Sequence, residues 1–145
     1  MRAARALQQA SGCPHGADIV LDKQLPMEAG LGGGSSDAAS TLLALNQLWG
    51  LQWPLARLLP LGATLGADVP FFLGGHNAWV EGIGERLTPL TLPPARFLVL
   101  KPPRGVSTPQ IFQSPHLKRD EKHTRIEDFV ASDAENIFGW GSNNL

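Results

Sequence analysis

The chain has 145 residues, and 43% of them are apolar, which is enough polypeptide for one domain with a hydrophobic core. Its formal net charge is −1 and its basic residues are scattered, which argues against a nucleic-acid-binding face. The single cysteine excludes an internal disulfide, and no apolar run approaches the roughly 20 residues of a membrane span. We therefore expect a cytoplasmic protein that binds neither nucleic acid nor membrane.

The first half of the chain predicts three helices and one strand. Good helix formers fill residues 3–10, and the short β-branched stretch at residues 17–21 predicts a strand. Apolar residues recur at three- and four-residue spacing over residues 36–49, which predicts an amphipathic helix. Pro54 suits the first turn of a further helix that continues to about residue 59.

The second half predicts shorter elements. Residues 76–81 and 86–90 predict two strands joined by a glycine-containing turn, and residues 96–100 predict another strand. A Thr-Pro pair sets up a short helix at residues 110–113, and the polar residues 116–124 predict an exposed loop.

One stretch is far more informative than the rest. Residues 26–39 read Pro-Met-Glu-Ala-Gly-Leu-Gly-Gly-Gly-Ser-Ser-Asp-Ala-Ala. A glycine loop that leads into a helix aims backbone N–H groups and the positive end of the helix dipole at one point, which suits a phosphate. The alternative is a flexible connector. A Walker A loop would need a lysine after the glycines, and a dinucleotide fingerprint would need glycine where Ser35 stands.

Asp68 is the strongest single candidate for chemistry. It follows Gly66-Ala67 and precedes the apolar run Val69-Pro70-Phe71-Phe72, so an acid stands at a turn beside an apolar wall. Such a carboxylate can accept a proton from a substrate hydroxyl. The alternative is an aspartate that caps the turn at Val69-Pro70.

These motifs carry a resemblance to a known family. Pro26-Met27 with Gly30 to Ala39 resembles the ATP-binding motif of the GHMP kinases. The resemblance becomes more specific with the run Leu65 to Phe72, and also with Thr108-Pro109-Ile111-Phe112 and Ser142-Asn143-Asn144. Together they resemble the members that phosphorylate 4-diphosphocytidyl-2-C-methyl-D-erythritol in the non-mevalonate (MEP) isoprenoid pathway.

The resemblance implies an α+β GHMP kinase fold. Residues 1–100 would form part of the N-terminal, ATP-binding domain, which is like domain 2 of ribosomal protein S5, and residues 101–145 would begin the C-terminal domain. The chain resembles the middle half of such an enzyme, so we expect it to be incomplete at both ends and inactive alone. The expected activity is transfer of the γ-phosphate of ATP to the substrate's 2-hydroxyl. Rival interpretations are a non-catalytic nucleotide-binding remnant and another GHMP small-molecule kinase.

The resemblance also implies a set of site residues. Asp68 would be catalytic and would contact the substrate, together with Thr108 and Phe112. ATP with Mg²⁺ would be bound by Lys23 and the glycine motif, namely Pro26, Met27, Glu28, Ala29, Gly30, Leu31, Gly32, Gly33, Gly34, Ser35 and Ser36. From the motif alone, capping of the helix is an equal alternative to nucleotide contact for each serine. For Lys23, an ordinary ion pair is an equal alternative to nucleotide contact. Phe112 read by itself favours a core position, and no protein ligand for a metal is expected.

Overall fold

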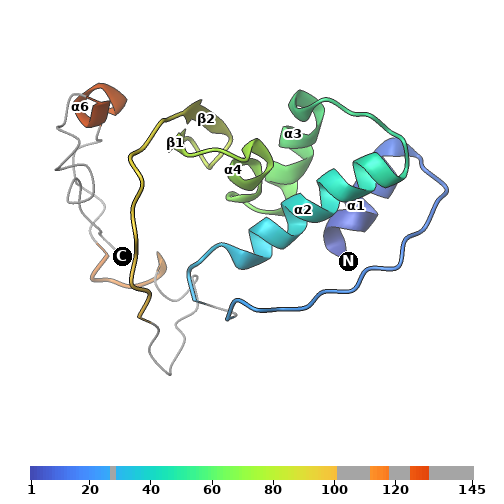
Figure 1. Cartoon of the computed structure of the whole chain (residues 1–145), viewed down its shortest axis with the longest axis horizontal. Coiled ribbons are helices and arrows are strands. Elements are labelled where there is room, and N and C mark those ends of the chain that lie inside the picture. Colours follow the sequence, from blue (N-terminus) through green and yellow to red (C-terminus); the bar gives the residue numbers. More distant parts are fainter. Residues whose placement is uncertain (27–28, 101–111, 118–124, 131–145) are drawn as a thin grey trace. The chain divides into compact units, whose positions relative to one another are not determined.

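The computed structural model describes residues 1–26, 29–100, 112–117 and 125–130 (Figure 1). The chain divides into two compact units, residues Met1–Leu92 and Pro93–Leu145, and each is described here by itself. The expected domain boundary at residue 100 stays a prediction.

The described residues of the first unit form helices followed by a β-hairpin (Figure 1). The elements are α1 (Arg2–Ser11), α2 (Gly33–Leu48), α3 (Leu55–Leu65), α4 (Val69–Gly74), β1 (Ala78–Glu81) and β2 (Arg86–Pro89). The two strands pair antiparallel, with Ala78 opposite Pro89 and Glu81 opposite Arg86. Helices and an antiparallel sheet that follow one another along the chain make an α+β arrangement.

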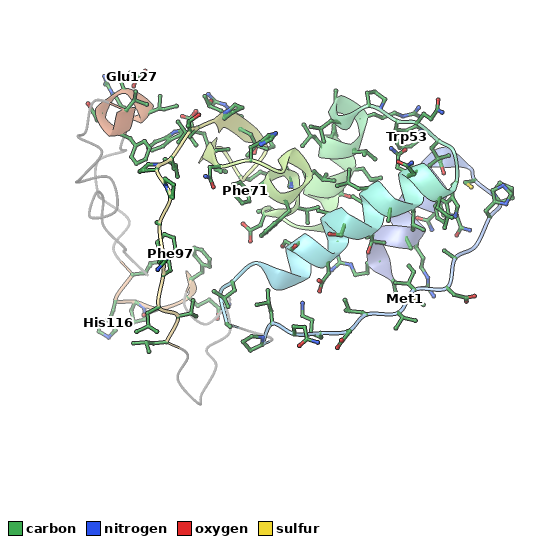
Figure 2. The ribbon with its side chains drawn as sticks, viewed as in Figure 1. Met1, Trp53, Phe71, Phe97, His116 and Glu127 are labelled. Atoms are coloured by element: carbon green, nitrogen blue, oxygen red, sulfur yellow. The ribbon has the colours of Figure 1, made fainter. Side chains whose placement is uncertain are left out.

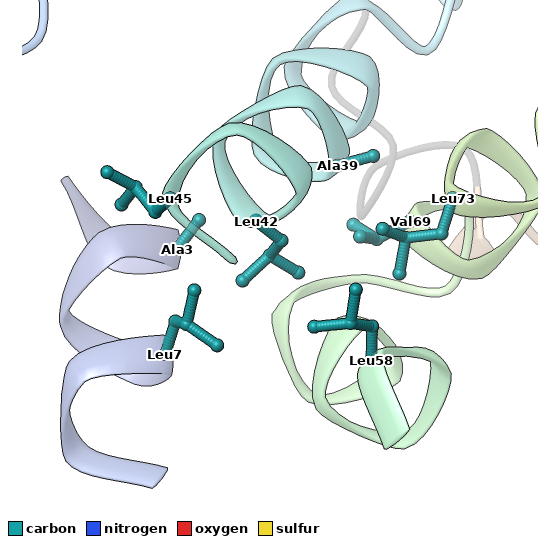
Figure 3. Close-up of a cluster of buried hydrophobic side chains, with 8 residues drawn as sticks. All are labelled: Ala3, Leu7, Ala39, Leu42, Leu45, Leu58, Val69 and Leu73. Carbon is teal, nitrogen blue, oxygen red and sulfur yellow. The ribbon is translucent and has the colours of Figure 1, made fainter. Parts of the chain in front are cut away.

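The core of this unit is built by one face from each of its four described helices (Figure 3). Its buried members are Ala3, Leu7, Ala39, Leu42, Leu45, Leu58, Val69 and Leu73. The three that come from α2 recur every third residue and belong to the apolar face that the sequence predicts for this helix, whereas Leu43 and Leu48, also expected on that face, are exposed. Because α4 supplies Val69 and Leu73, the core holds α4 against α2.

Two hydrogen bonds made by the Asn46 side chain fix the connection between α2 and α3. The Asn46 side chain accepts a hydrogen bond from the Trp53 backbone N–H at 2.9 Å and donates one to the Trp53 carbonyl at 3.1 Å. The connection contains two residues with positive φ, Gly50 at 64° and Gln52 at 51°. After it, the Arg57 guanidinium lies 3.6 Å from the centre of the Trp53 ring, which Figure 2 labels beside α3.

Two predicted strands are wrong. Residues 17–21 and 96–100 have no regular structure, and within the described part of the chain the only sheet is the pair β1–β2. Their apolar side chains are exposed, with Val20 at 96% and Leu98 at 86%. A strand needs a hydrogen-bonding neighbour, and composition alone does not supply one.

The turn expected at Val69-Pro70 is also wrong, because α4 begins there. Pro70 is compatible with a helix at this position, since the first turn needs no donor from it. The helix at residues 3–10, the helix at residues 36–49, the helix that follows Pro54 and the hairpin are confirmed. Of the helix predicted at residues 110–113 only residues 112 and 113 are described, and of the loop predicted at residues 116–124 only residues 116 and 117.

In the second unit, residues 93–100 have no regular structure and α6 spans Ile126–Val130. Among the described residues, no helix of either unit is long and apolar enough to cross a membrane.

Candidate functional site

Helix α2 begins inside the glycine motif, three residues earlier than the sequence predicts. Its first residue is Gly33, and Gly32 occupies the N-cap position with φ 65° and ψ 10°. This left-handed conformation is one that glycine adopts without steric cost. Ser35 and Ser36 therefore lie in the first turn rather than at the cap, so the capping alternative for both serines is wrong.

The first turn of α2 is open on the side where a ligand would approach. The first N–H groups of a helix have no partner within it, so they remain available to an anion. A Cβ atom built on Gly34 meets nothing within 4 Å. The space beside Gly34 in this turn is therefore open.

A cation lies beside this turn. The ammonium of Lys23 forms an ion pair with the Asp37 carboxylate at 2.5 Å, and the two side chains are 28% and 35% exposed. The same nitrogen lies 3.1 Å from the position that a Cβ on Gly33 would take. The ion-pair alternative for Lys23 is therefore what the structure contains. Because both side chains are partly exposed, the pair contributes at most about 1 kcal/mol to stability.

A pocket of about 850 Å³ surrounds these groups. Sites for small molecules commonly enclose about 300–1,000 Å³. Its described lining comes from the start of α1, the extended segment before the glycines, the glycine motif with the first turns of α2, and the α3–α4 region. These residues are Met1, Arg2, Ala3, Ile19, Leu21, Lys23, Pro26, Ala29, Gly30, Leu31, Gly32, Gly33, Gly34, Ser35, Asp37, Ala38, Thr41, Leu65 and Val69.

Asp68 lies at the N-cap position of α4 and is exposed. Its side chain makes no capping hydrogen bond, so the capping alternative is not realised. Asp68 is not among the residues that line the pocket, but Leu65 and Val69 on either side of it are. In the chain, Asp68 thus lies at the border of the pocket, directly before the wall residue Val69.

The structure brings together most, but not all, of the residues expected from the sequence. Lys23 and the described glycine-motif residues line the pocket, with the exception of Ser36, which lies on the same first turn. Met27, Glu28 and Thr108 lie outside the described residues. Phe112 belongs to the second unit and is 53% exposed, so it does not occupy the core position that its sequence favours.

Several residues of this region were not among the site residues expected from the sequence, although Asp37 lies within the glycine-motif stretch. Asp37 holds Lys23, Ile19 and Leu21 form an apolar wall, and Arg2 adds a second cation to the lining. No group of three or more His, Cys, Asp or Glu side chains gathers anywhere in the described part of the chain.

The family model of the GHMP kinases N terminal domain matches residues 1–76 of the chain. The chain belongs to the GHMP kinase family. This membership confirms the expected fold class. All of the described lining of the pocket falls within the residues that this family model matches.

Curated relatives of this GHMP kinase chain match it over its full length. The 4-diphosphocytidyl-2-C-methyl-D-erythritol kinase of Methylibium petroleiphilum is 62% identical, and that of Polaromonas naphthalenivorans is 59% identical. Each alignment covers 100% of the chain and 49% of the relative. The chain therefore spans about half the length of the curated relatives it matches.

A solved structure agrees with these relatives. A crystal structure of 4-(cytidine 5'-diphospho)-2C-methyl-D-erythritol kinase superposes with a TM-score of 0.72 and 40% identity. The match covers 95% of the chain and 49% of the solved protein.

Proposed function

We propose that this chain carries the ATP-binding part of a 4-diphosphocytidyl-2-C-methyl-D-erythritol kinase. The reaction would transfer the γ-phosphate of ATP to the 2-hydroxyl of the cytidyl substrate. The observation that carries the proposal is the open first turn of α2, with Gly34 facing free space in a pocket of about 850 Å³. The names of the matching relatives supply the substrate.

The phosphates of the nucleotide would lie against the N–H groups of Gly33 and Gly34. Glycine permits this approach because no side chain stands between the ligand and the backbone. The Lys23 ammonium lies close enough to compensate phosphate charge, and Asp37 holds it in place. Mg²⁺ would enter with the triphosphate and supply further charge compensation.

The remaining parts of the nucleotide and substrate have candidate partners. Ile19 and Leu21 give the pocket an apolar wall that suits the adenine ring. Asp68 at the border of the pocket would accept the proton of the 2-hydroxyl as the phosphate is transferred. Thr108 and Phe112 remain candidates for contacts with the cytosine.

A second candidate function is nucleotide binding without catalysis. The observation in its favour is that Asp68 does not line the pocket. The two candidates differ in one measurable respect, because only the first requires that turnover depend on Asp68.

Calorimetry of Mg–ATP binding to the whole chain tests the binding step, with Gly34→Ala and Gly16→Ala as a matched pair. A Cβ on either glycine meets nothing within 4 Å in this structure, so neither variant should disturb the fold. Gly34→Ala should weaken binding by about 10- to 100-fold, since one or two charge-assisted hydrogen bonds contribute about 1.5–3 kcal/mol each. Gly16→Ala should leave the affinity unchanged. Equal affinities for both variants would contradict the proposal.

A full-length chimera tests the chemical step. These 145 residues would replace the aligned segment of the Polaromonas naphthalenivorans relative, whose alignment with the chain also spans 145 residues. In the chimera, Asp68→Asn should lower substrate-dependent ATP consumption about 100-fold or more and leave ATP affinity nearly unchanged. A variant with turnover within about threefold of the parent would favour the non-catalytic alternative.

A further inference from the structure

The ring of Phe72 lies against the glycine turn that begins α2. A Cβ atom built on Gly32 would lie 2.7 Å from Cζ and 2.8 Å from Cε2 of Phe72. Real Cβ atoms do not approach other atoms this closely, so the ring occupies the space that any side chain at position 32 would need. The ring edge is therefore in direct contact with the glycine turn that lines the pocket.

Phe72 is also joined to Asp68 by the first turn of α4. The Phe72 backbone N–H donates to the Asp68 carbonyl at 3.4 Å, so the two residues lie one helical turn apart. Residues four apart occupy the same face of a helix. The face of α4 that rests on the glycine turn is thus the face that begins with Asp68.

The chain on the other side of Asp68 also lies near α2. A Cβ on Gly66 would lie 3.8 Å from Oγ of Ser35, which places the turn before Asp68 near the first turn of α2. Asp68 therefore stands between two residues that lie close to the start of α2, namely Gly66 before it and Phe72 after it. Only the Phe72 contact is made by a large rigid side chain.

The ring has support of its own. Phe71 packs edge-on against it, with the ring centres 5.3 Å apart and the planes at 80° (Phe71 is labelled on α4 in Figure 2). Edge-to-face pairs of this kind restrict ring orientation. Phe72 also packs on the buried core through α4. The position of the Phe72 ring is consequently set by Phe71 and the buried core as well as by the glycine turn.

We propose that Phe72 is a positioning residue whose ring sets the separation between the phosphate-binding turn and the start of α4 that carries Asp68. The inference rests on the proposed function, since it assigns Phe72 a role in placing Asp68 relative to the nucleotide. A shorter side chain lets α4 approach the turn, and a longer one pushes it away. Both changes misplace Asp68, and a misplacement of about 1 Å can cost about 100-fold in rate.

The test measures turnover and Mg–ATP affinity in the full-length chimera for Phe72→Leu and Phe72→Tyr. The tyrosine hydroxyl would extend from Cζ, the atom that already faces Gly32, so this variant keeps a ring and an apolar body while increasing the separation. We expect each variant to lower turnover about 10-fold or more. Phe71→Leu removes the ring that restricts Phe72 but keeps the Phe72 ring against the glycine turn, so it should lower turnover less than either Phe72 variant does.

Combination with Asp68→Asn separates positioning from a general structural effect. If Phe72 acts by placing the Asp68 carboxylate, Phe72→Leu should lower turnover by less than about twofold once that carboxylate is gone. Equal losses in both backgrounds would overturn the proposal, and so would full turnover in Phe72→Tyr. If Asp68→Asn itself retains full turnover, the proposed function of Asp68 fails instead, and the two failures are distinguishable. Melting of the whole chain shows whether each variant is folded.

Discussion

The hairpin turn between β1 and β2 rests on the backbone just before Asp68, and replacing Gly84 should dislodge it. Gly84 has φ 113°, a region that residues with a Cβ rarely enter. A Cβ built on it would lie 2.8 Å from the Ala67 carbonyl carbon and closer still to the oxygen. Because the obstructing atoms belong to the backbone, no side-chain rotation can relieve the overlap in Gly84→Ala.

The cost has two parts. Holding a non-glycine residue in a sparsely populated backbone region costs about 1–3 kcal/mol. Forcing extra volume against fixed atoms costs about a further 1–3 kcal/mol, which gives a total of about 2–6 kcal/mol. Domains are stable by only about 5–15 kcal/mol, so the hairpin should separate from Ala67 instead of the whole unit distorting.

Gly82→Ala is the matched control, because Gly82 lies in the same turn and also has a positive φ, of 71°. The group nearest to a Cβ on Gly82 is the Glu85 carboxylate, which is exposed and can rotate away with loss of the hydrogen bond that it accepts from the Ile83 backbone N–H. This variant should cost the left-handed backbone penalty of about 1–2 kcal/mol and about 0.5–1.5 kcal/mol for that hydrogen bond. Urea denaturation of the chain and its two variants measures the difference, and amide exchange at Trp79 and Thr88, which face each other as a hydrogen-bonded pair, shows whether the hairpin opens. Variants whose unfolding free energies agree within about 0.5 kcal/mol would refute the reasoning.

Two further outcomes are expected. Lys23→Met should weaken Mg–ATP binding about 10-fold and reduce its dependence on salt, while the free energy of unfolding falls by about 1 kcal/mol or less, because the ion pair with Asp37 is partly exposed. Unchanged affinity in calorimetry would show that Lys23 serves only that ion pair. Leu42→Ala should cost about 2–5 kcal/mol, because Leu42 is 0% exposed, whereas Leu43→Ala on the same helix should cost far less, since Leu43 is 42% exposed. Similar midpoints for both variants in urea would contradict the buried face assigned to α2.

The helices of the first unit were predictable because their signals are local. Ala39, Leu42 and Leu45 repeat along one face of α2, and that spacing is visible in the sequence itself. The start of α2 was missed by three residues, since glycine has a low helix propensity and the contact of Gly32 with the Phe72 ring joins residues far apart in the sequence. The two wrong strands failed for the opposite reason. Residues 17–21 and 96–100 have strand composition, but pairing depends on a partner elsewhere in the chain.

Residues of the site could be predicted from the sequence only where they belong to a recognisable motif. The glycine motif and Lys23 do line the pocket, and Asp68 lies at its border. The pairing of Lys23 with Asp37 joins residues 14 positions apart, and the contact of Gly84 with Ala67 joins two separate elements. Such contacts follow from how helices pack, which a single sequence does not encode in any short pattern. Thr108 lies outside the described residues, so its role stays a prediction.

The connection between α2 and α3 has a consequence for protein engineering. Gln52 holds a left-handed conformation that disfavours long side chains, while asparagine tolerates it well. The two hydrogen bonds of the Asn46 side chain fix both backbone groups of Trp53, so the path of the connection does not depend on the residue at position 52. The described lining of the pocket includes no residue of this connection. Gln52→Asn therefore offers a gain in stability at a position remote from nucleotide binding, where the usual trade between robustness and activity does not apply.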